Sequence, residues 1–370
     1  MLRTIALALT ATTALAAAIP AAIADELTAA YSRVLADPTN SELSIQYAQL
    51  AEARGEYRKA LAAYERVLVN DPDNTVAKDG LQRVRRIIQP AETQKIVEIG
   101  ATWQSNVLRS PMATDDVLGY GSFRLKDERA MGLHRWRTNL NFYGEAYADE
   151  TEMNYAAING DIGPIMDIKG TNLSVRPGVG VGTAWLAGRN YYWDVNATAL
   201  FEGYLNGAYQ WLRFRAGYRQ YDPSFTSGAG SYFDVTGRFA IQDVFHDRDS
   251  LSVSPWFRWS GINGLPDNGS LDFATGLYIE GGANFEYAKA ISDRLSASVN
   301  VKVLDRLYND IGIGSRQDWS VAPGASLVFK NLFGPQSDLR FDYKYEWNNS
   351  NMPNHTWQNQ SATVAIVFRR

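Results

Sequence analysis

The residues that usually carry enzymatic chemistry are scarce in this chain. It contains no cysteine, and its three histidines, His134, His246 and His355, stand far apart in the sequence. Zinc sites draw on histidine, cysteine and acidic ligands at short, characteristic spacings, and no such spacing occurs here. The glycine-rich stretch PGVGVG at residues 177–182 lies in a strand pattern and does not open a helix, as a phosphate-binding loop must. We therefore expect no metal and no other cofactor.

A protease or lipase would need a serine or aspartate beside a histidine that a third group orients. In the strand order derived below, His134 and His246 fall near turns at one end of a barrel, and His355 falls in a loop at the other end. Because the histidines are separated in this way, we predict that the protein is not an enzyme.

The composition argues against nucleic acid as a partner and favours a membrane. The net charge of −4 provides no basic footprint for nucleic acid. The chain carries 20 Tyr and 10 Trp, and membrane barrels use such aromatic residues at their two bilayer interfaces. After residue 25 no apolar run reaches the ~18 residues that a spanning helix needs. Any membrane-spanning part should therefore consist of strands.

The first 24 residues have the pattern of a secretory signal peptide. Arg3 supplies a positive charge, an apolar stretch follows to about Ala18, and Ala22 and Ala24 form a small-x-small cleavage site. An uncleaved anchor helix is the alternative, but the apolar stretch is rich in alanine and too short to span a bilayer. We predict export, with cleavage after Ala24.

Residues 25–90 are predicted to form a short helical domain. The stretch at residues 40–74 carries apolar residues at three- and four-residue spacings and resembles a tetratricopeptide repeat. The matching positions, which we predict to be packing positions, are Tyr47, Ala48, Gly55, Tyr57, Ala60, Tyr64, Val67 and Pro72. A related helix upstream and a third helix over about Thr75 to Ile88 would complete the stack. The domain would serve either as a docking surface or as a plug or spacer.

From residue 93 to residue 370 the pattern changes to a period of two. In DLRFDYKYEW, at residues 338–347, apolar residues alternate with charged ones, and similar segments recur along the chain. Repeated segments of about ten residues with this alternation are typical of transmembrane β-barrels. Counting them predicts an antiparallel barrel of about fourteen strands. Longer loops should lie at one end, and short turns and both chain ends at the other.

A barrel of this width leaves a lumen that side chains do not fill, and the charged parity of the strands should line it. The residues predicted to line the lumen are Arg135, Arg137, Arg213, Arg215, Arg219, Arg258 and Asp342. Acidic residues of the same parity include Asp194, Glu202, Asp234 and Glu280. Mutually satisfied ion pairs are the first interpretation of such a wall, and a specific ligand site is the second.

Three prolines, Pro177, Pro255 and Pro323, lie inside predicted strands on the apolar parity. Proline cannot donate to a ladder, so each should mark either a bulge or a locally unpaired position.

The chain ends in SATVAIVFRR, residues 361–370, which we predict to be the last strand of the barrel. Closure should pair it with the preceding strand and with the first strand near Val97 and Ile99. We expect Phe368→Ala to lower the amount of inserted barrel, and removal of the two terminal arginines not to do so.

These features together resemble a known family. An exported chain in which tetratricopeptide-like helices precede a fourteen-strand barrel is similar to the surface lipoprotein assembly modulator (Slam) family. The segment IGATWQSNVLRSP, residues 99–111, is similar to that family's opening strand, with matches at Ser105, Asn106, Val107 and Pro111. The resemblance implies an outer-membrane translocator that delivers surface lipoproteins or related secreted proteins. The helical domain is shorter than the family's usual one.

Two other functions remain open. An exopolysaccharide export porin also joins such repeats to a barrel, generally with more repeats and more strands, and would carry a polysaccharide. A small-solute porin would use the helices only as a plug. In all three cases we expect the barrel in the outer membrane and the helical domain in the periplasm. The expected partners are membrane lipid, periplasmic chaperones, the barrel-assembly machinery and the transported substrate.

Overall fold

The structure is a computed structural model that describes residues 26–132, 134–168, 171–205, 207–225, 228–263, 276–309 and 315–370. The predicted signal peptide, residues 1–24, lies outside the described residues. The chain divides into two compact units, and the main boundary between them falls between Pro90 and Ala91.

Helices make up the N-terminal part of the first unit. The first covers residues 26–36, and α2 (Ser41–Ala53), α3 (Tyr57–Asn70) and α4 (Thr75–Ile88) follow. Asparagine side chains cap two of them: Asn40 accepts from the first turn of α2, and Asn74 accepts from the amide of Ala77 in α4 at 3.0 Å. The described helices are all too short or too polar to cross a membrane.

The residues that match the repeat pattern lie mainly in the core of this helical domain. Ala48 and Ala60 are fully buried, and their small side chains let α2 and α3 approach closely. Gly55 has a φ of +76° in the turn between these helices, a value that glycine adopts without steric cost. The other repeat positions divide into buried residues (Tyr47, Tyr64, Val67), a partly buried one (Tyr57) and an exposed turn residue (Pro72).

A polar network fixes the central tyrosine of the helical domain. The Tyr64 hydroxyl donates to Glu52 at 3.0 Å, and the Arg83 guanidinium donates to the same carboxylate at 2.7 Å. Burial raises the pKa of the Tyr64 phenol, and the charge of Glu52 raises it further. The hydroxyl therefore stays protonated and holds its ring against α4.

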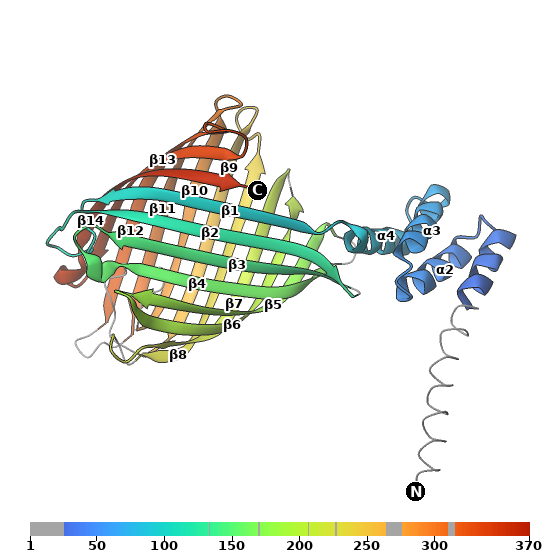
Figure 1. The fold of residues 1–370 in the computed structure, drawn as a ribbon, viewed down its shortest axis with the longest axis horizontal. Coiled ribbons are helices and arrows are strands. Elements are labelled where there is room, and N and C mark those ends of the chain that lie inside the picture. Colours follow the sequence, from blue (N-terminus) through green and yellow to red (C-terminus); the bar gives the residue numbers. More distant parts are fainter. Residues whose placement is uncertain are drawn as a thin grey trace, which may run out of the picture. The chain divides into compact units, whose positions relative to one another are not determined.

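The second unit confirms the predicted fold, a closed antiparallel barrel of fourteen strands (Figure 1). The strands follow the chain order around the barrel, and β1 closes it against β14. Their bounds are β1 Glu92–Gln104, β2 Asp116–Met131, β3 His134–Tyr147, β4 Tyr155–Asp167, β5 Leu173–Leu186, β6 Arg189–Leu205, β7 Ala208–Tyr221, β8 Ala229–Gln242, β9 Asp249–Gly261, β10 Leu277–Ala290, β11 Leu295–Tyr308, β12 Arg316–Phe329, β13 Ser337–Ser350 and β14 Trp357–Arg369.

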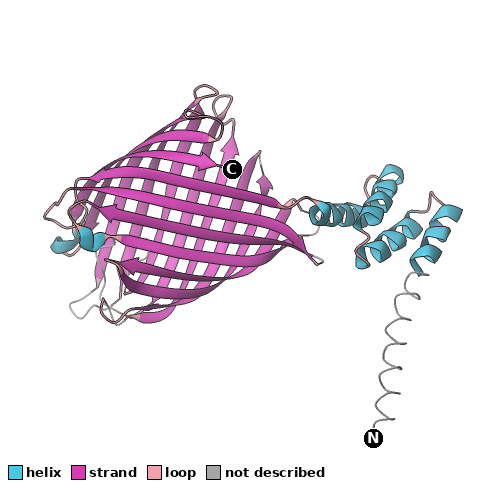
Figure 2. Ribbon diagram, viewed as in Figure 1, coloured by secondary structure: helices cyan, strands magenta, loops and turns pink. Residues whose placement is uncertain are grey.

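The connections between strands alternate between the two ends of the barrel, as predicted. One end, called here the loop end, carries the connections that follow the odd-numbered strands. Two short 3-10 helices, η1 (Thr151–Met153) and η2 (Pro353–His355), belong to this end (Figure 2). The other end, the turn end, carries the connections that follow the even-numbered strands. The start of β1 and the end of β14 also lie at this end. Both ends of the barrel sequence therefore lie on the same side.

The outer face of the barrel is apolar. Side chains on the predicted apolar parity are exposed along the strands, and they include Val195, Phe257, Trp259, Val299, Phe341 and Trp347. Water cannot be the preferred neighbour of so many exposed valine, phenylalanine and tryptophan side chains. A closed barrel leaves no unpaired sheet edge, which is the condition for strands to cross lipid.

The three prolines predicted to lie in strands, Pro177, Pro255 and Pro323, mark locally unpaired positions, and β4 holds a further proline, Pro164. Opposite Pro177, the β4–β5 pairing stops after Ile162–Val179 and resumes at Met166–Val175 in the same register. The β8–β9 ladder skips the positions around Pro255, and the β12–β13 ladder skips those around Pro323, again without a shift of register. Each of the three predicted prolines thus keeps one paired neighbour and interrupts the other ladder, so a bulge is not needed.

The seam between β1 and β14 has the predicted register, with Val97 opposite Phe368 and Ile99 opposite Ile366. The two terminal arginines take part in it. Arg369 forms an ion pair with the buried Asp338, and the backbone of Arg370 exchanges hydrogen bonds with Lys95 at 2.6 and 2.8 Å. These contacts change the expectation that both arginines can be removed without effect.

We expect Arg369→Ala to lower the stability of the closed barrel by about 1–3 kcal/mol, because it leaves the Asp338 carboxylate buried without its cation. The temperature at which the folded barrel unfolds on a semi-native gel measures this. Arg370→Ala is the matched control, since the seam uses only the backbone of that residue. Equal unfolding temperatures for the two variants would contradict the role given to Arg369.

Candidate functional site

The candidate site is the inner wall of the barrel, formed by the strand positions that alternate with the apolar outer face. The alternation is clear in β6 and β7, where Asp194 and Arg219 are buried inward while Val195 and Tyr218 are exposed outward. Three buried clusters of charged and aromatic side chains lie on this wall, and a further cluster crosses the seam.

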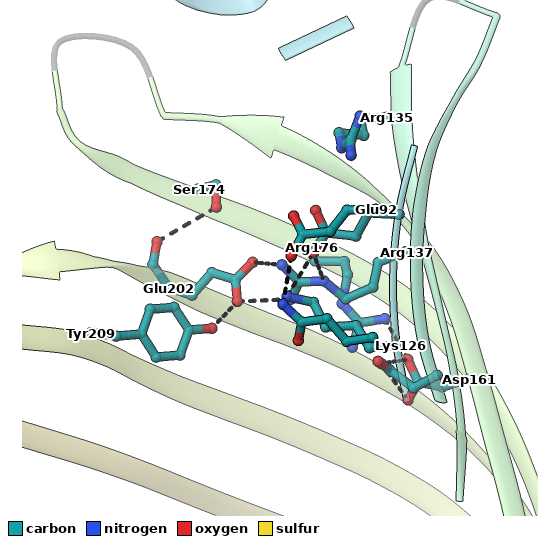
Figure 3. Close-up of polar contacts among 12 residues, drawn as sticks. Glu92, Lys126, Arg135, Arg137, Asp161, Ser174, Arg176, Glu202 and Tyr209 are labelled. Carbon is teal, nitrogen blue, oxygen red and sulfur yellow. Dashed lines mark hydrogen bonds and ion pairs between the residues drawn. The ribbon is translucent and has the colours of Figure 1, made fainter. Parts of the chain in front are cut away.

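The first cluster centres on Arg137 in β3 (Figure 3). Its guanidinium donates to Glu128 on β2 at 2.7 Å and to both carboxylate oxygens of Glu202 on β6 at 2.7 and 2.8 Å. The Tyr209 hydroxyl also donates to Glu202, and Lys126 pairs with Glu128 at 3.0 Å. One arginine thus joins β2 to β6 across the inner wall.

The second cluster lies on β6 to β8. The Arg219 Nε donates to Asp194 at 3.3 Å, and the Tyr232 hydroxyl donates to the other oxygen of that carboxylate at 3.0 Å. Arg219 also stacks on the ring of Tyr192, with 3.9 Å between its Cζ and the ring centroid. Next to it, Arg215 donates to Asp234 at 2.7 Å. Cation–π stacking and charge-assisted hydrogen bonds together make this part of the wall rigid.

The third cluster lies on β9 to β11 and shares one carboxylate among several donors. Arg306 donates to Glu280 at 2.7 Å, the indole of Trp256 donates to it at 3.0 Å, and Arg258 lies 3.6 Å from it. Tyr278 packs beside Arg306, with 5.1 Å between the guanidinium carbon and the ring centroid. The fourth cluster crosses the seam, where Arg340 on β13 donates to Asp342 at 2.6 Å and to Glu98 on β1 at 2.7 Å.

The structure brings together five of the residues predicted to line the lumen. Arg137, Arg215, Arg219, Arg258 and Asp342 all belong to the clusters described above. Most of the charged wall is therefore internally paired, which was the first of the two interpretations.

Two of the predicted lumen-lining residues behave differently from these. Arg135, at the start of β3, is buried and donates to the carbonyls of Gln89 and Pro90 at 3.0 Å each, within the first compact unit. It anchors the chain that leads into β1. Arg213, on β7, is partly buried, and no described carboxylate forms an ion pair with it.

Sequence reasoning missed the inward-facing tyrosines. Tyr221, Tyr232, Tyr278 and Tyr308 are fully buried at the loop end of the inner wall. The abundance of aromatic residues points to the lipid interfaces, but strand parity places these four inward, because each lies an even number of residues from an inward arginine or acid of its own strand.

The three histidines remain separate. His134 begins β3, His246 lies in the turn after β8, and His355 lies in η2. Burial lowers the pKa of His355. Across the described ranges, no three histidine or acidic side chains are grouped so that they could hold a metal ion.

Part of the inner wall is open to solvent. The inward side chains of Arg124 on β2, Arg238 on β8 and Lys344 on β13 are 54%, 45% and 42% exposed. The ion pairs of Arg124 with Glu98 and of Arg238 with Glu286 are loose, at 3.7 Å each, whereas Lys344 lies 3.0 Å from Glu346. Charged groups with this exposure need water around them.

No family model matches the chain, and no curated protein matches it in sequence. Among solved structures, the chain is similar to the OpdK protein of Pseudomonas aeruginosa crystallised with vanillate (8% identity, 75% of this chain, 99% of that chain, TM-score 0.38). It is also similar to the outer-membrane channel DcaP of Acinetobacter baumannii (8%, 76% and 97%, TM-score 0.44) and to OccAB1 of the same organism (9%, 77% and 97%, TM-score 0.40). The fold described above rests on the strand pairing of this chain itself.

Proposed function

We propose that the protein is an outer-membrane channel for small polar solutes. The observation that supports this best is the exposure of Arg124, Arg238 and Lys344 inside a fourteen-strand barrel. Eight strands can be filled by side chains, and wider barrels leave a lumen. Inward-facing charged side chains that are about half exposed to solvent favour a lumen filled with water.

The placement in the outer membrane is part of this proposal. An even number of antiparallel strands, an apolar outer face and a charged inner face are the properties of single-chain outer-membrane barrels. With both ends of the barrel sequence at the turn end, the helical domain would begin on the periplasmic side. Transport without chemistry fits a wall whose charges are mostly paired with each other.

A protein translocator is the second candidate, and the helical domain favours it. A stack of repeat-like helices with its own core is more than a pore needs, and such repeats commonly provide docking surfaces. The Ser-Asn-Val motif gives less support, because Asn106 has a structural contact. Its buried side chain donates to the carbonyls of Ser110 at 2.8 Å and Gln358 at 3.0 Å, which fastens the first loop to β14.

Planar-bilayer recording of the purified full-length protein tests the proposal. We expect a steady conductance that rises linearly with voltage and with salt concentration, because a water-filled lumen conducts ions without a partner. Heat-modifiable gel migration of the same sample verifies that the barrel is folded. A folded barrel that conducts nothing would contradict the solute channel. In that case, deletion of the gene and comparison of surface proteins and surface glycan would separate the translocator from a polysaccharide exporter.

A further inference from the structure

Five buried polar atoms without a hydrogen-bond partner lie on adjacent strands of the inner wall. They are Arg176 Nε on β5, Thr198 Oγ1 on β6, Arg213 Nε on β7, and Asp234 Oδ1 and Thr236 Oγ1 on β8. We call these five residues the β5–β8 patch. Buried polar atoms in native proteins nearly always have a partner, so a group of orphans calls for water or a ligand.

The strand register shows that the patch is continuous. Thr236 lies directly opposite Arg213, and Thr198 and Asp234 lie on the two sides of Arg215. On β5, a Cβ added to Gly178 would lie 3.0 Å from Thr198 Oγ1 and 3.5 Å from Arg176 Nη1. The glycine therefore leaves these two groups close together on the wall.

The charges of the patch do not balance. Arg176 forms an ion pair with Asp161, and Arg215 forms one with Asp234. Arg213 lies near the same two carboxylates but has no ion pair with either. The guanidinium groups of Arg176, Arg213 and Arg215 thus face two carboxylates, while the nearby Arg258 lies beside Glu280. Thr236 lies opposite the uncompensated Arg213, and Thr198 lies opposite its neighbour Arg215. An anion is the ligand that such a site favours.

Asp234 Oδ1, a buried acceptor without a hydrogen-bond partner, restricts which anions fit the patch. Asp234 binds Arg215 through Oδ2, and its Oδ1 is a buried acceptor that needs a donor. A plain anion such as acetate or chloride brings no donor and would leave this oxygen unpaired, which costs affinity. A carboxylate that also carries hydroxyl groups satisfies both the guanidinium and the acceptor.

We propose that the β5–β8 patch is a binding site for hydroxylated carboxylates, such as a sugar acid, within the lumen. The carboxylate of the ligand lies on Arg213, whose planar fork suits it, and the ligand's hydroxyl groups exchange hydrogen bonds with Thr198, Thr236 and Asp234 Oδ1. The inference rests on the proposed function as a solute channel, whose substrate class it names.

Isothermal titration calorimetry of the folded, detergent-solubilised full-length protein with galacturonate tests the site without relying on conductance. We expect binding that weakens about tenfold or more in Arg213→Gln, because a charge-assisted hydrogen-bond pair is lost. Arg238→Gln is the matched control. It removes an inward arginine that is half exposed and loosely paired, and we expect affinity within about twofold of the unchanged protein.

Replacing both hydroxyl-bearing residues tests the specificity. Thr198→Val with Thr236→Val should weaken galacturonate binding and leave the weaker binding of acetate unchanged. Absence of galacturonate binding, or equal losses in Arg213→Gln and Arg238→Gln, would overturn the proposal. Conductance without binding would overturn the site and keep the channel, whereas binding without conductance would keep the site and overturn the channel.

Discussion

Gly80→Leu is expected to unfold the helical domain while the barrel remains intact. A Cβ at Gly80 would lie 2.3 Å from Cζ of the Tyr64 ring and under 3 Å from two further ring atoms. The ring cannot move aside, because it is fully buried and its hydroxyl is bound to Glu52, which Arg83 holds in turn. Overpacking of this kind costs about 1–3 kcal/mol for added methylenes, and a domain of about 65 residues has little stability in reserve.

Limited proteolysis of the full-length protein measures this effect, with cleavage inside residues 26–90 as the readout. Heat-modifiable migration of the protected fragment reports on the barrel, which forms a separate compact unit. Lys78→Ala, at an exposed position on the same helix, is the control. Gly80→Ala should show a smaller loss, because alanine favours helix by about 1 kcal/mol over glycine and offsets part of the clash. Unchanged protease resistance in Gly80→Leu would contradict this packing.

The barrel was predictable because its two determinants are local. The pleat puts successive side chains on opposite faces, so Leu339 and Phe341 could be placed outward and Asp342 inward from the sequence alone. Turn residues such as those in the stretch at 332–337 then gave the ends of the strands. The number of strands, the alternation of the two ends and the partners of β14 followed from these two signals.

The partners on the inner wall were not predictable, because they depend on the stagger between strands that are distant in sequence. Arg137 lies 65 residues from Glu202, and Arg340 lies 242 residues from Glu98. Parity gives the face of each side chain but not its height along the barrel. The same limit explains Arg135. Its position in the alternation points it inward, but it lies at the very start of β3, where it contacts the backbone at Gln89 and Pro90.

The charged inner wall has two parts. Mutually satisfied ion pairs describe one part, and a specific ligand site describes the other. Mutual ion pairs account for Arg137, Arg215 and Arg219, whereas Arg213 has an Nε without a hydrogen-bond partner and the excess charge that a ligand site requires. The sequence lists three inward arginines on β7 without distinguishing them. Only the register, which supplies acids opposite two of them and Thr236 opposite the third, separates the roles.

Arg137→Met is expected to destabilise the barrel by about 3–5 kcal/mol, because removing one partner of a buried ion pair leaves the others uncompensated. Glu202 is buried and would keep only the Tyr209 hydroxyl, while Glu128 would keep Lys126. The urea midpoint of tryptophan fluorescence in detergent micelles, with its slope, measures the change.

Two comparisons make this result specific. The double variant Arg137→Met with Glu202→Met should recover much of the loss, because an apolar pair of similar volume avoids the buried unpaired charge. Arg238→Met, which breaks a half-exposed pair at 3.7 Å, should cost less than about 1 kcal/mol. A double variant no more stable than Arg137→Met would contradict this explanation. It would mean that Arg137 does not stabilise the barrel by compensating the charge of Glu202, and that packing alone connects β2 to β6.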